Sequence, residues 1–270
     1  MILAYHNIVP SGEAVAGERA LHLSQEQFGA QLDLLAGTHD VIPLEDAIHA
    51  RPRSGRPRAV ITWDDAYLGT VTVGVAEVSR RGLPATIFVC PGRLGGQAFW
   101  WDCVAEEAGG QVPASVRRRV LEEWAGDGAV VEVGPVISAG ARLPPHARSA
   151  GEQDLARAAS TPGISLGGHS WSHPNLARLP ADRLVRELVE TREWLESRFP
   201  SAFPWLAYPY GLESEPVRTA TREAGYRGGC LIRGGWMGDS SPDPFRLPRL
   251  HVPAGLSLQG FELRMAGLFC

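Results

Sequence analysis

The sequence predicts an α/β fold with a parallel sheet, either barrel-like or doubly wound. Two segments, residues 59–61 and 85–89, are apolar and rich in β-branched residues, which is typical of strands buried on both faces. Segments with helical periodicity separate the expected strands, as in folds that alternate strands and helices. The 270 residues, 44% of them hydrophobic, suffice for one large α/β domain or two small ones.

Strands and helices alternate over the first 90 residues. Ser24 and Gln27 match a capping box at the start of an amphipathic helix, and Gly37 ends that helix. The expected elements are a strand at residues 2–5, this helix, a brief extended piece at 41–44, a strand that begins at 59 and ends at an acidic pair, a helix at 70–81 and a strand at 85–89.

Residues 91–161 lack a regular pattern, and we expect them to form an insertion within a single domain of residues 1–270. The insertion contains an aromatic cluster at 99–102 and a charged helix at 114–125. Beyond it the alternation resumes. The expected elements there are strands at 164–169, 204–208, 227–232 and 245–252, and helices at 181–199 and 214–224.

Charge and composition argue against several classes of protein. The chain has 26 basic residues, all of them Arg, and 30 acidic residues, so neither a nucleic-acid surface nor a polyanionic substrate is favoured. The four cysteines lack CxxC spacing and are expected to be reduced thiols. Without a signal-peptide pattern or a stretch of about 18 apolar residues, we expect a soluble, cytoplasmic protein with no membrane span.

Asp64 and Asp65 stand at the C-terminal end of the strand that begins at residue 59. In α/β folds, catalytic groups gather at this end of parallel strands. A single Asp there is as well explained as a helix cap. A pair favours catalysis, because one carboxylate can stay ionised on a cation while the other moves a proton.

His169 and His173 form a second group of candidate site residues. Their spacing is that of two ligands on one helix face, but no Glu follows His169, and Pro174 disfavours helical geometry at His173. We therefore expect both in a loop at a strand end, like the acidic pair. Two imidazoles and a carboxylate suit a divalent metal with open positions for water or substrate. Four other histidines have no such context and are expected on the surface: His22, His39, His49 and His146.

Three motifs follow one another along the chain: Thr-Trp-Asp-Asp at 62–65, His-Ser-Trp-Ser-His at 169–173 and Tyr-Pro-Tyr-Gly at 208–211, with an apolar strand within 81–89 between the first two. In this order and spacing, they resemble the motifs of the NodB-homology polysaccharide deacetylases, a carbohydrate esterase family of metal-dependent N- and O-deacetylases. Residues 5–6 and 245–249 resemble the branch found in bacterial surface-glycan gene clusters. The similarity covers nearly the whole chain.

The resemblance implies a distorted (β/α)7 barrel with its site at the strand C-termini and the irregular insertion after the third strand. It assigns Asp65, His169 and His173 as ligands of one divalent metal ion. Zinc is the first expectation, with cobalt, nickel, manganese or iron as alternatives. Asp64 becomes the general base, since a bound cation lowers the pKa of water and polarises the amide carbonyl.

The resemblance also implies further catalytic and substrate-binding residues around the metal site. The backbone N–H of Tyr210 would hold the oxyanion, and a late histidine, here His251, would protonate the leaving amine. An aromatic face is what a pyranose ring stacks on, which favours Trp101 as a substrate contact. The full set of expected substrate contacts is His6, Trp63, Trp101, Tyr208 and Tyr210.

The chain departs from the family pattern at several positions. Trp63 replaces the usual Phe, and Ala66 stands where Gly normally follows the acidic pair. Ala207 occupies a position where many members carry an Arg that orients the base. Asp64 therefore needs another partner, either Arg246 or Arg249. The fourth family motif is not recognisable, and residues 235–239 only mark its place.

The leading expectation for function is a metal-dependent hydrolase that removes an acetyl or formyl group from an amino sugar or a sugar-containing substrate. The alternative enzyme hydrolyses a non-sugar C–N bond of the cyclic imide or ureide type. A glycan-binding module without catalysis is the remaining alternative. Because both the base and the ligands are intact, the sequence favours an enzyme.

Overall fold

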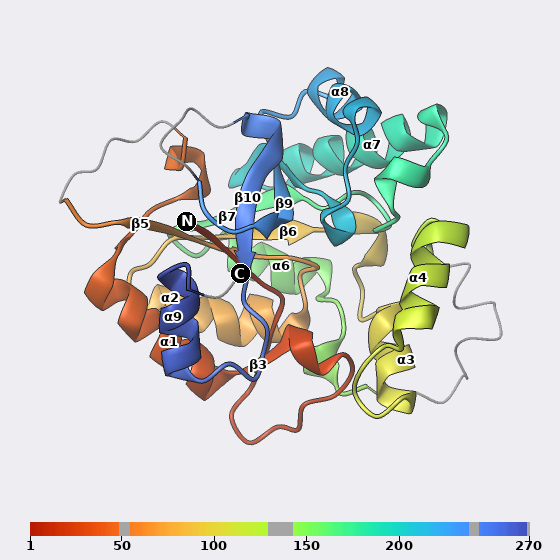
Figure 1. Cartoon of the computed structure of the whole chain (residues 1–270). Coiled ribbons are helices and arrows are strands. Elements are labelled where there is room, and N and C mark those ends of the chain that lie inside the picture. The colour runs from red at the N-terminus through yellow and green to blue at the C-terminus, as the bar shows by residue number, and fades with distance from the viewer. Residues whose placement is uncertain (49–54, 129–142, 238–242, 269–270) are drawn as a thin grey trace.

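The computed structural model describes residues 1–48, 55–128, 143–237 and 243–268 (Figure 1). Parallel strands form a closed barrel in the described part of the chain. In sequence order they are β1 (Ile2–Tyr5), β5 (Arg58–Trp63), β6 (Ala85–Val89), β7 (Ile164–Gly168), β8 (Ala202–Ala207), β9 (Gly228–Gly234) and β10 (Leu247–His251). The barrel closes because β1 pairs with both β5 and β10. The expected seven-stranded (β/α) barrel is therefore confirmed.

Helices surround this barrel, and the first of them follows its sequence signals closely. In α1 (Gln25–Thr38), the Ser24 hydroxyl accepts the Gln27 N–H, and Phe28, Leu32 and Leu35 are buried. Further helices around the barrel are α2 (Val75–Ser79), which continues a π-helical segment at Thr70–Gly74, α6 (Glu152–Ala159), α7 (Ala181–Arg198), α8 (Glu215–Glu223) and α9 (Leu258–Met265). Three short strands complete the set: β2 (Asn7–Val9) pairs with β3 (His22–Ser24), and β4 (Asp40–Val41) adds to the edge of β5.

The insertion between β6 and β7 is more regular than expected. It contains α3 (Trp100–Glu107) and α4 (Ala114–Glu123) as well as α6. Figure 1 shows α3 and α4, in yellow, side by side at one flank of the barrel, and Val104 and Val120 share one apolar cluster there. Helix α9 was not expected at all. None of the described helices has both the length and the apolar character needed to cross a membrane.

Two layers of apolar side chains hold the barrel together. Val60, Phe88, Trp205 and Leu247 come from four different barrel strands and meet in one buried cluster, which therefore fills the barrel interior. The same cluster includes Leu44, from a 3-10 turn at Leu44–Asp46. Alternate residues of each strand point outward and pack under the helices. Because apolar side chains fill the barrel interior, we look for catalytic residues at the ends of the strands.

Candidate active site

The carboxyl ends of the barrel strands surround a cavity of about 320 Å³. Because all barrel strands are parallel, residues that follow different strands arrive at one mouth. The predicted site residues that line this cavity are His6, Asp64, Asp65, Trp101, His169, His173, Tyr210 and His251. The structure thus brings together eight of the ten site residues that were predicted from the sequence.

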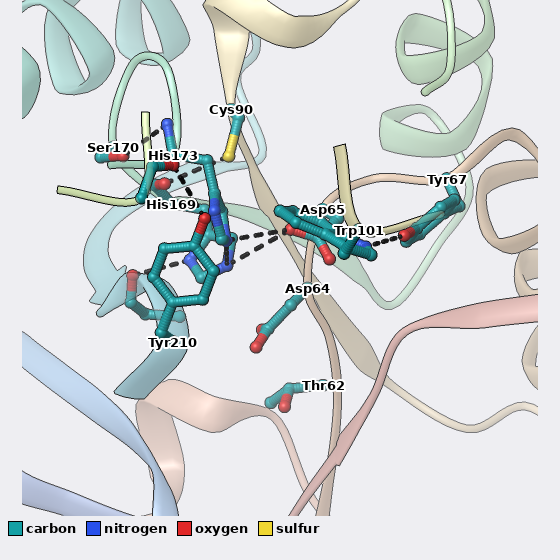
Figure 2. A network of polar contacts seen from close by, with 12 residues as sticks. Thr62, Asp64, Asp65, Tyr67, Cys90, Trp101, His169, Ser170, His173 and Tyr210 are labelled. Atoms are coloured by element: carbon teal, nitrogen blue, oxygen red, sulfur yellow. Dashed lines mark hydrogen bonds and ion pairs between the residues drawn. The ribbon is translucent and has the colours of Figure 1, made fainter. Parts of the chain in front are cut away.

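Asp65, His169 and His173 form a compact buried cluster (Figure 2). Asp65 Oδ1 lies 3.5 Å from His169 Nε2 and 3.3 Å from His173 Nε2, and the two Nε2 atoms are 3.2 Å apart. In a tetrahedral site with bonds of about 2.0–2.1 Å, neighbouring ligand atoms are about 3.3–3.4 Å apart. The three atoms therefore have the spacing of one face of such a site.

The protonation states favour a cation in this cluster. His169 Nδ1 lies 2.8 Å from the Ala207 carbonyl oxygen, so Nδ1–H donates there and the Nε2 lone pair faces Asp65. Burial lowers the pKa of His169 and lowers that of His173 well below its ordinary value, which keeps both imidazoles neutral. Burial and the charge of Asp64 raise the pKa of Asp65, and Asp65 Oδ1 has no hydrogen-bond partner among the described residues. One bound cation would satisfy all three groups.

Strained backbone marks the same place. Six described non-glycine residues have positive φ, and five of them line or flank this cluster: Asp65 (72°), Ala66 (52°), Ser170 (62°), His173 (64°) and Tyr210 (59°). Such conformations cost on the order of 1–3 kcal/mol each and gather at functional sites. Local contacts fix the histidine loop, since Ser170 Oγ accepts the His173 N–H at 3.1 Å.

Asp64 is held by Arg249, from β10. Two 2.7 Å hydrogen bonds join the guanidinium to both carboxylate oxygens, and Arg249 is buried. Burial is the largest single influence on the pKa of Asp64 and would raise it, but the charge and hydrogen bonds of Arg249, together with His169 and His6, outweigh burial and hold the pKa well below its usual range. Arg246, the other candidate partner, instead faces Glu213 at 3.3 Å. Arg249 therefore supplies the contact that Ala207 cannot make.

His6 and His251 lie together at the mouth, on neighbouring strand ends. Their ring centroids are 5.5 Å apart, and His6 Nδ1 is buried without a described hydrogen-bond partner. Burial lowers the pKa of His6 to about 3 and that of His251 to about 4. Both imidazoles are therefore neutral in the resting protein at neutral pH, so His251 does not carry the proton of a general acid in advance.

Two aromatic side chains, Trp101 and Tyr210, pack beside the metal-binding cluster. The rings of Trp101 and Tyr210 lie 4.8 and 4.5 Å from that of His173. The Trp101 indole N–H donates to the Tyr67 hydroxyl at 2.8 Å (Figure 2). This hydroxyl in turn donates to Asp102 at 2.6 Å. Tyr67 and Asp102 were not predicted, because nothing in the sequence indicates a contact between positions 35 residues apart.

Two histidines expected on the surface are buried, at 1% exposure for His22 and 6% for His146. His22 lies between Asn7 and Asp102, with hydrogen bonds of 2.9 and 2.8 Å. Its two ring nitrogens are both engaged, so His22 anchors the far end of the chain of hydrogen bonds that holds Trp101. The prediction for these two histidines was wrong because an isolated histidine carries no periodic burial signal; His49 lies outside the described residues.

Trp63 and Tyr208 do not line the cavity, contrary to expectation. Trp63 is fully buried and packs outward against Phe28 of α1, because its side chain points to the opposite face of β5 from that of Asp64. The Tyr208 hydroxyl donates to the Phe245 carbonyl, and its ring lies in the apolar cluster with residues of α7 and α8. Both are core residues, and neither is kept as a substrate contact.

The fold and the site together define a parallel (β/α) barrel with an Asp-His-His metal-binding cluster at the strand ends. A sequence profile of one family, described as polysaccharide deacetylase, matches residues 51–229, which is more than half of the chain. The chain belongs to the polysaccharide deacetylase family.

Solved structures of low sequence identity share this fold. The Streptococcus pyogenes deacetylase PplD, in complex with acetate, is 16% identical with a TM-score of 0.65, over 98% of this chain and 96% of that one. A de-N-acetylase from Aggregatibacter actinomycetemcomitans is 14% identical with a TM-score of 0.66, over 97% and 98%. IcaB from Ammonifex degensii is 14% identical with a TM-score of 0.64, over 98% and 94%. No curated protein matches the sequence.

Proposed function

We propose that this protein is a metal-dependent hydrolase that removes an N-acetyl, or alternatively a formyl, group from an amino sugar within a glycan. The observation that carries the proposal is the Asp65-His169-His173 cluster, beside an ionised Asp64, in a cavity at the barrel mouth. The family and the de-N-acetylase among the similar structures support the reaction type. A bacterial surface glycan is the substrate source that we propose first.

The ligand set of one carboxylate and two imidazoles fits a borderline divalent ion, and we propose zinc before cobalt, nickel, manganese or iron. When bound, such an ion lowers the pKa of water and polarises an amide carbonyl. In this chain, Asp65, His169 and His173 would hold it. All three residues line the cavity, so water or substrate in the cavity would reach an ion held there.

Asp64 is the proposed general base. Its ionised carboxylate lines the cavity and takes a proton from the attacking water. Arg249 fixes both carboxylate oxygens, so the base keeps one orientation. The same contact stabilises the carboxylate and weakens it as a base, so Asp64 returns the proton readily once the tetrahedral state collapses.

The leaving amine needs a proton, and two groups can deliver it. Asp64 can return the proton that it took from water. His251, neutral in the resting protein, can serve as acid only after it has accepted a proton. We propose His6, Trp101 and Tyr210 as substrate contacts, because all three line the cavity and the two aromatic rings suit an acyl methyl or a sugar face. The Tyr210 backbone N–H is proposed to support the oxyanion.

The decisive experiment measures acetate and formate release from a panel of N-acylated sugars and oligosaccharides, with each divalent metal added to metal-free protein. We expect one metal ion per chain and metal-dependent release. His169→Ala and His173→Ala should lose the metal and nearly all activity, whereas Asp64→Asn should keep the metal and lose on the order of 10²–10⁴-fold in rate. Full metal occupancy in both histidine variants would reject the site.

The same panel should contain cyclic imides and ureides. Hydrolysis of these compounds without release from any acylated sugar would favour the non-sugar alternative. Binding of glycans without hydrolysis at any metal would favour a binding module.

A further inference from the structure

A second cavity of about 510 Å³ lies beside the metal-binding cavity. The two cavities share Arg117 and Leu121 of α4, so they adjoin each other at that helix, and we refer to the second cavity as the groove. The second cavity is also lined by Asn175, two residues after the ligand His173, and by Leu212, next to Gly211 of the first cavity. A substrate longer than one sugar would therefore extend from the metal centre into this groove.

The groove carries an excess of guanidinium groups. Arg117, Arg118 and Arg178 line it, against the acids Glu122 and Glu213. Glu213 is already engaged by Arg218 and Arg246, and Arg117 by Glu18, which leaves Glu122 as the lining acid that faces Arg118 and Arg178. Arg118 and Arg178 are exposed and have no acidic partner within 4.0 Å among the residues that the structure describes. The surface at the groove is therefore locally positive, although the whole chain has a net charge of −4.

Arg117 is fixed at the junction of the two cavities. Its Nη2 lies 2.8 Å from Glu18 Oε2, and Glu18 is buried and also accepts the Val112 N–H. A guanidinium has five N–H donors, and Arg117 lines both cavities. An arginine held in this way loses little side-chain entropy when it binds an anion.

We propose that this groove is a subsite for an anionic sugar unit, so that the substrate is an acidic glycan in which a carboxylate- or phosphate-bearing unit neighbours the N-acyl amino sugar. Guanidinium groups recognise both anions through paired hydrogen bonds. This inference rests on the proposed deacetylase function, and it specifies the substrate class of that activity.

The test compares acetate release from two tetrasaccharides: fully acetylated chitotetraose, which is neutral, and a heparosan tetrasaccharide, which alternates N-acetylglucosamine with glucuronate. Arg118→Gln/Arg178→Gln should lower kcat/KM about 3- to 10-fold on the acidic substrate and leave the neutral one unchanged, since exposed ion pairs are individually weak. Added salt should abolish the difference between wild type and variant. UDP-N-acetylglucosamine as a third substrate distinguishes phosphate from carboxylate as the preferred anion.

Two single variants make the comparison sharper. Arg119→Gln removes the same charge from the same helix, but Arg119 pairs with Glu123 and stacks on Trp124 away from the groove, so it should change nothing. Glu122→Gln removes the opposing acid and should raise kcat/KM on the acidic substrate about 2-fold. Equal losses on both tetrasaccharides, or an Arg119→Gln variant that matches the double variant, would overturn the subsite.

Calorimetric binding to Asp64→Asn protein separates this inference from the proposed function. Acidic tetrasaccharide that binds through Arg118 and Arg178 without being hydrolysed by wild type would support the subsite and reject the activity. Equal affinity for neutral and acidic tetrasaccharide, or no binding of either, would reject the subsite whatever the activity.

Discussion

Arg249 determines the charge state of Asp64. Without the two guanidinium hydrogen bonds, burial would dominate and raise the pKa of this carboxyl. The resemblance leads us to expect such an arginine at position 207, where this chain has Ala. Arg249 of β10 supplies the charge instead, and β10 and β5, which ends just before Asp64, both pair with β1.

Arg249→Met should therefore move the acid limb of kcat/KM towards neutral pH, because Asp64 would be protonated over more of the acid range. A buried carboxylate left without its partner should also destabilise the fold by about 3–5 kcal/mol. Both effects are measured by a pH–rate profile and by urea unfolding. Arg246→Gln, which removes the half-exposed partner of Glu213, is the control and should alter neither, because Glu213 keeps its contact with Arg218. An unchanged acid limb in Arg249→Met would contradict the assigned role.

Tyr67 connects Trp101 to Asp102 through one hydroxyl group. Tyr67→Phe should raise KM more than it lowers kcat, because Trp101 would lose the hydrogen bond that orients it beside His173. The cost in unfolding free energy should be about 1–3 kcal/mol, since two buried polar groups lose a partner. Tyr5→Phe is the matched control: it removes another buried hydroxyl, which donates to Gln31 of α1, and Tyr5 does not line the cavity. Equal kinetic effects in the two variants would show that Tyr67 has only a structural role.

At the scale of elements, β7 carries His169 into the site and needs its glycines to do so. A Cβ on Gly167 would lie 2.7 Å from the Phe88 ring and 2.9 Å from the Trp205 carbonyl oxygen. Gly167→Ala should therefore destabilise the protein by about 1–3 kcal/mol and weaken metal binding by displacing His169. Denaturant unfolding and a metal titration measure the two effects.

Gly37→Ala, in α1, is the control for that substitution. Apart from the backbone of its own helix and its chain neighbours, no atom lies within 4 Å of the added Cβ, so the variant should gain about 0.5–1 kcal/mol and bind metal as wild type does. Wild-type stability of Gly167→Ala would mean that β7 can shift to accommodate the methyl group.

The sequence predicted the elements whose apolar pattern is regular and missed those whose pattern is weak. Helices α1, α7 and α8 were expected within a residue or two of their observed bounds, since leucine spacing or caps mark them. Helix α6 was missed, because Leu155 is the one large apolar residue in an alanine-rich octapeptide. Side chains alternate between the two faces of a strand. This rule, applied to β5, would have placed the Trp63 side chain on the opposite face from Asp64 and so outside the cavity.

Pairings across the fold could not be predicted in the same way. Arg249 was one of two candidates for the partner of Asp64, and only the closure of the barrel distinguishes it from Arg246. The contact of Tyr67 with Asp102, and the position of Arg117 at the cavity, depend on how α3 and α4 fold back over the mouth. A motif identifies the groups that do chemistry, whereas the shape of the substrate site depends on the insertion.

At the scale of the whole molecule, β1, the first barrel strand, lies between the second barrel strand and the last. It pairs with β5 on one side and β10 on the other, so the N-terminal segment closes the barrel. His6 directly follows β1, and His251 ends β10, so this junction places two neutral histidines side by side at the cavity. The stability of the closed barrel is thereby linked to pH.

The metal-free protein should lose stability as the pH falls from about 6.5 towards 4. Burial lowers the pKa of His6 to about 3 and of His251 to about 4 in the folded protein, while the unfolded chain takes up these protons near 6.5. In that window the unfolded state binds more protons, so the free energy of unfolding decreases as the pH decreases. One such group contributes at most about 1.4 kcal/mol per pH unit, and solvent in the open cavity reduces this.

Urea unfolding between pH 7 and 4 in wild type and in His6→Gln/His251→Gln measures this link. The ligands His169 and His173, with pKa values that burial also lowers, add a slope of the same sign in both proteins, so the difference between the two slopes isolates the pair. The double variant should flatten the profile by about 1 kcal/mol per pH unit while its stability at pH 7 changes little. Parallel profiles for the two proteins would mean that solvent enters the junction freely and that His6 and His251 protonate there as they do in the unfolded chain.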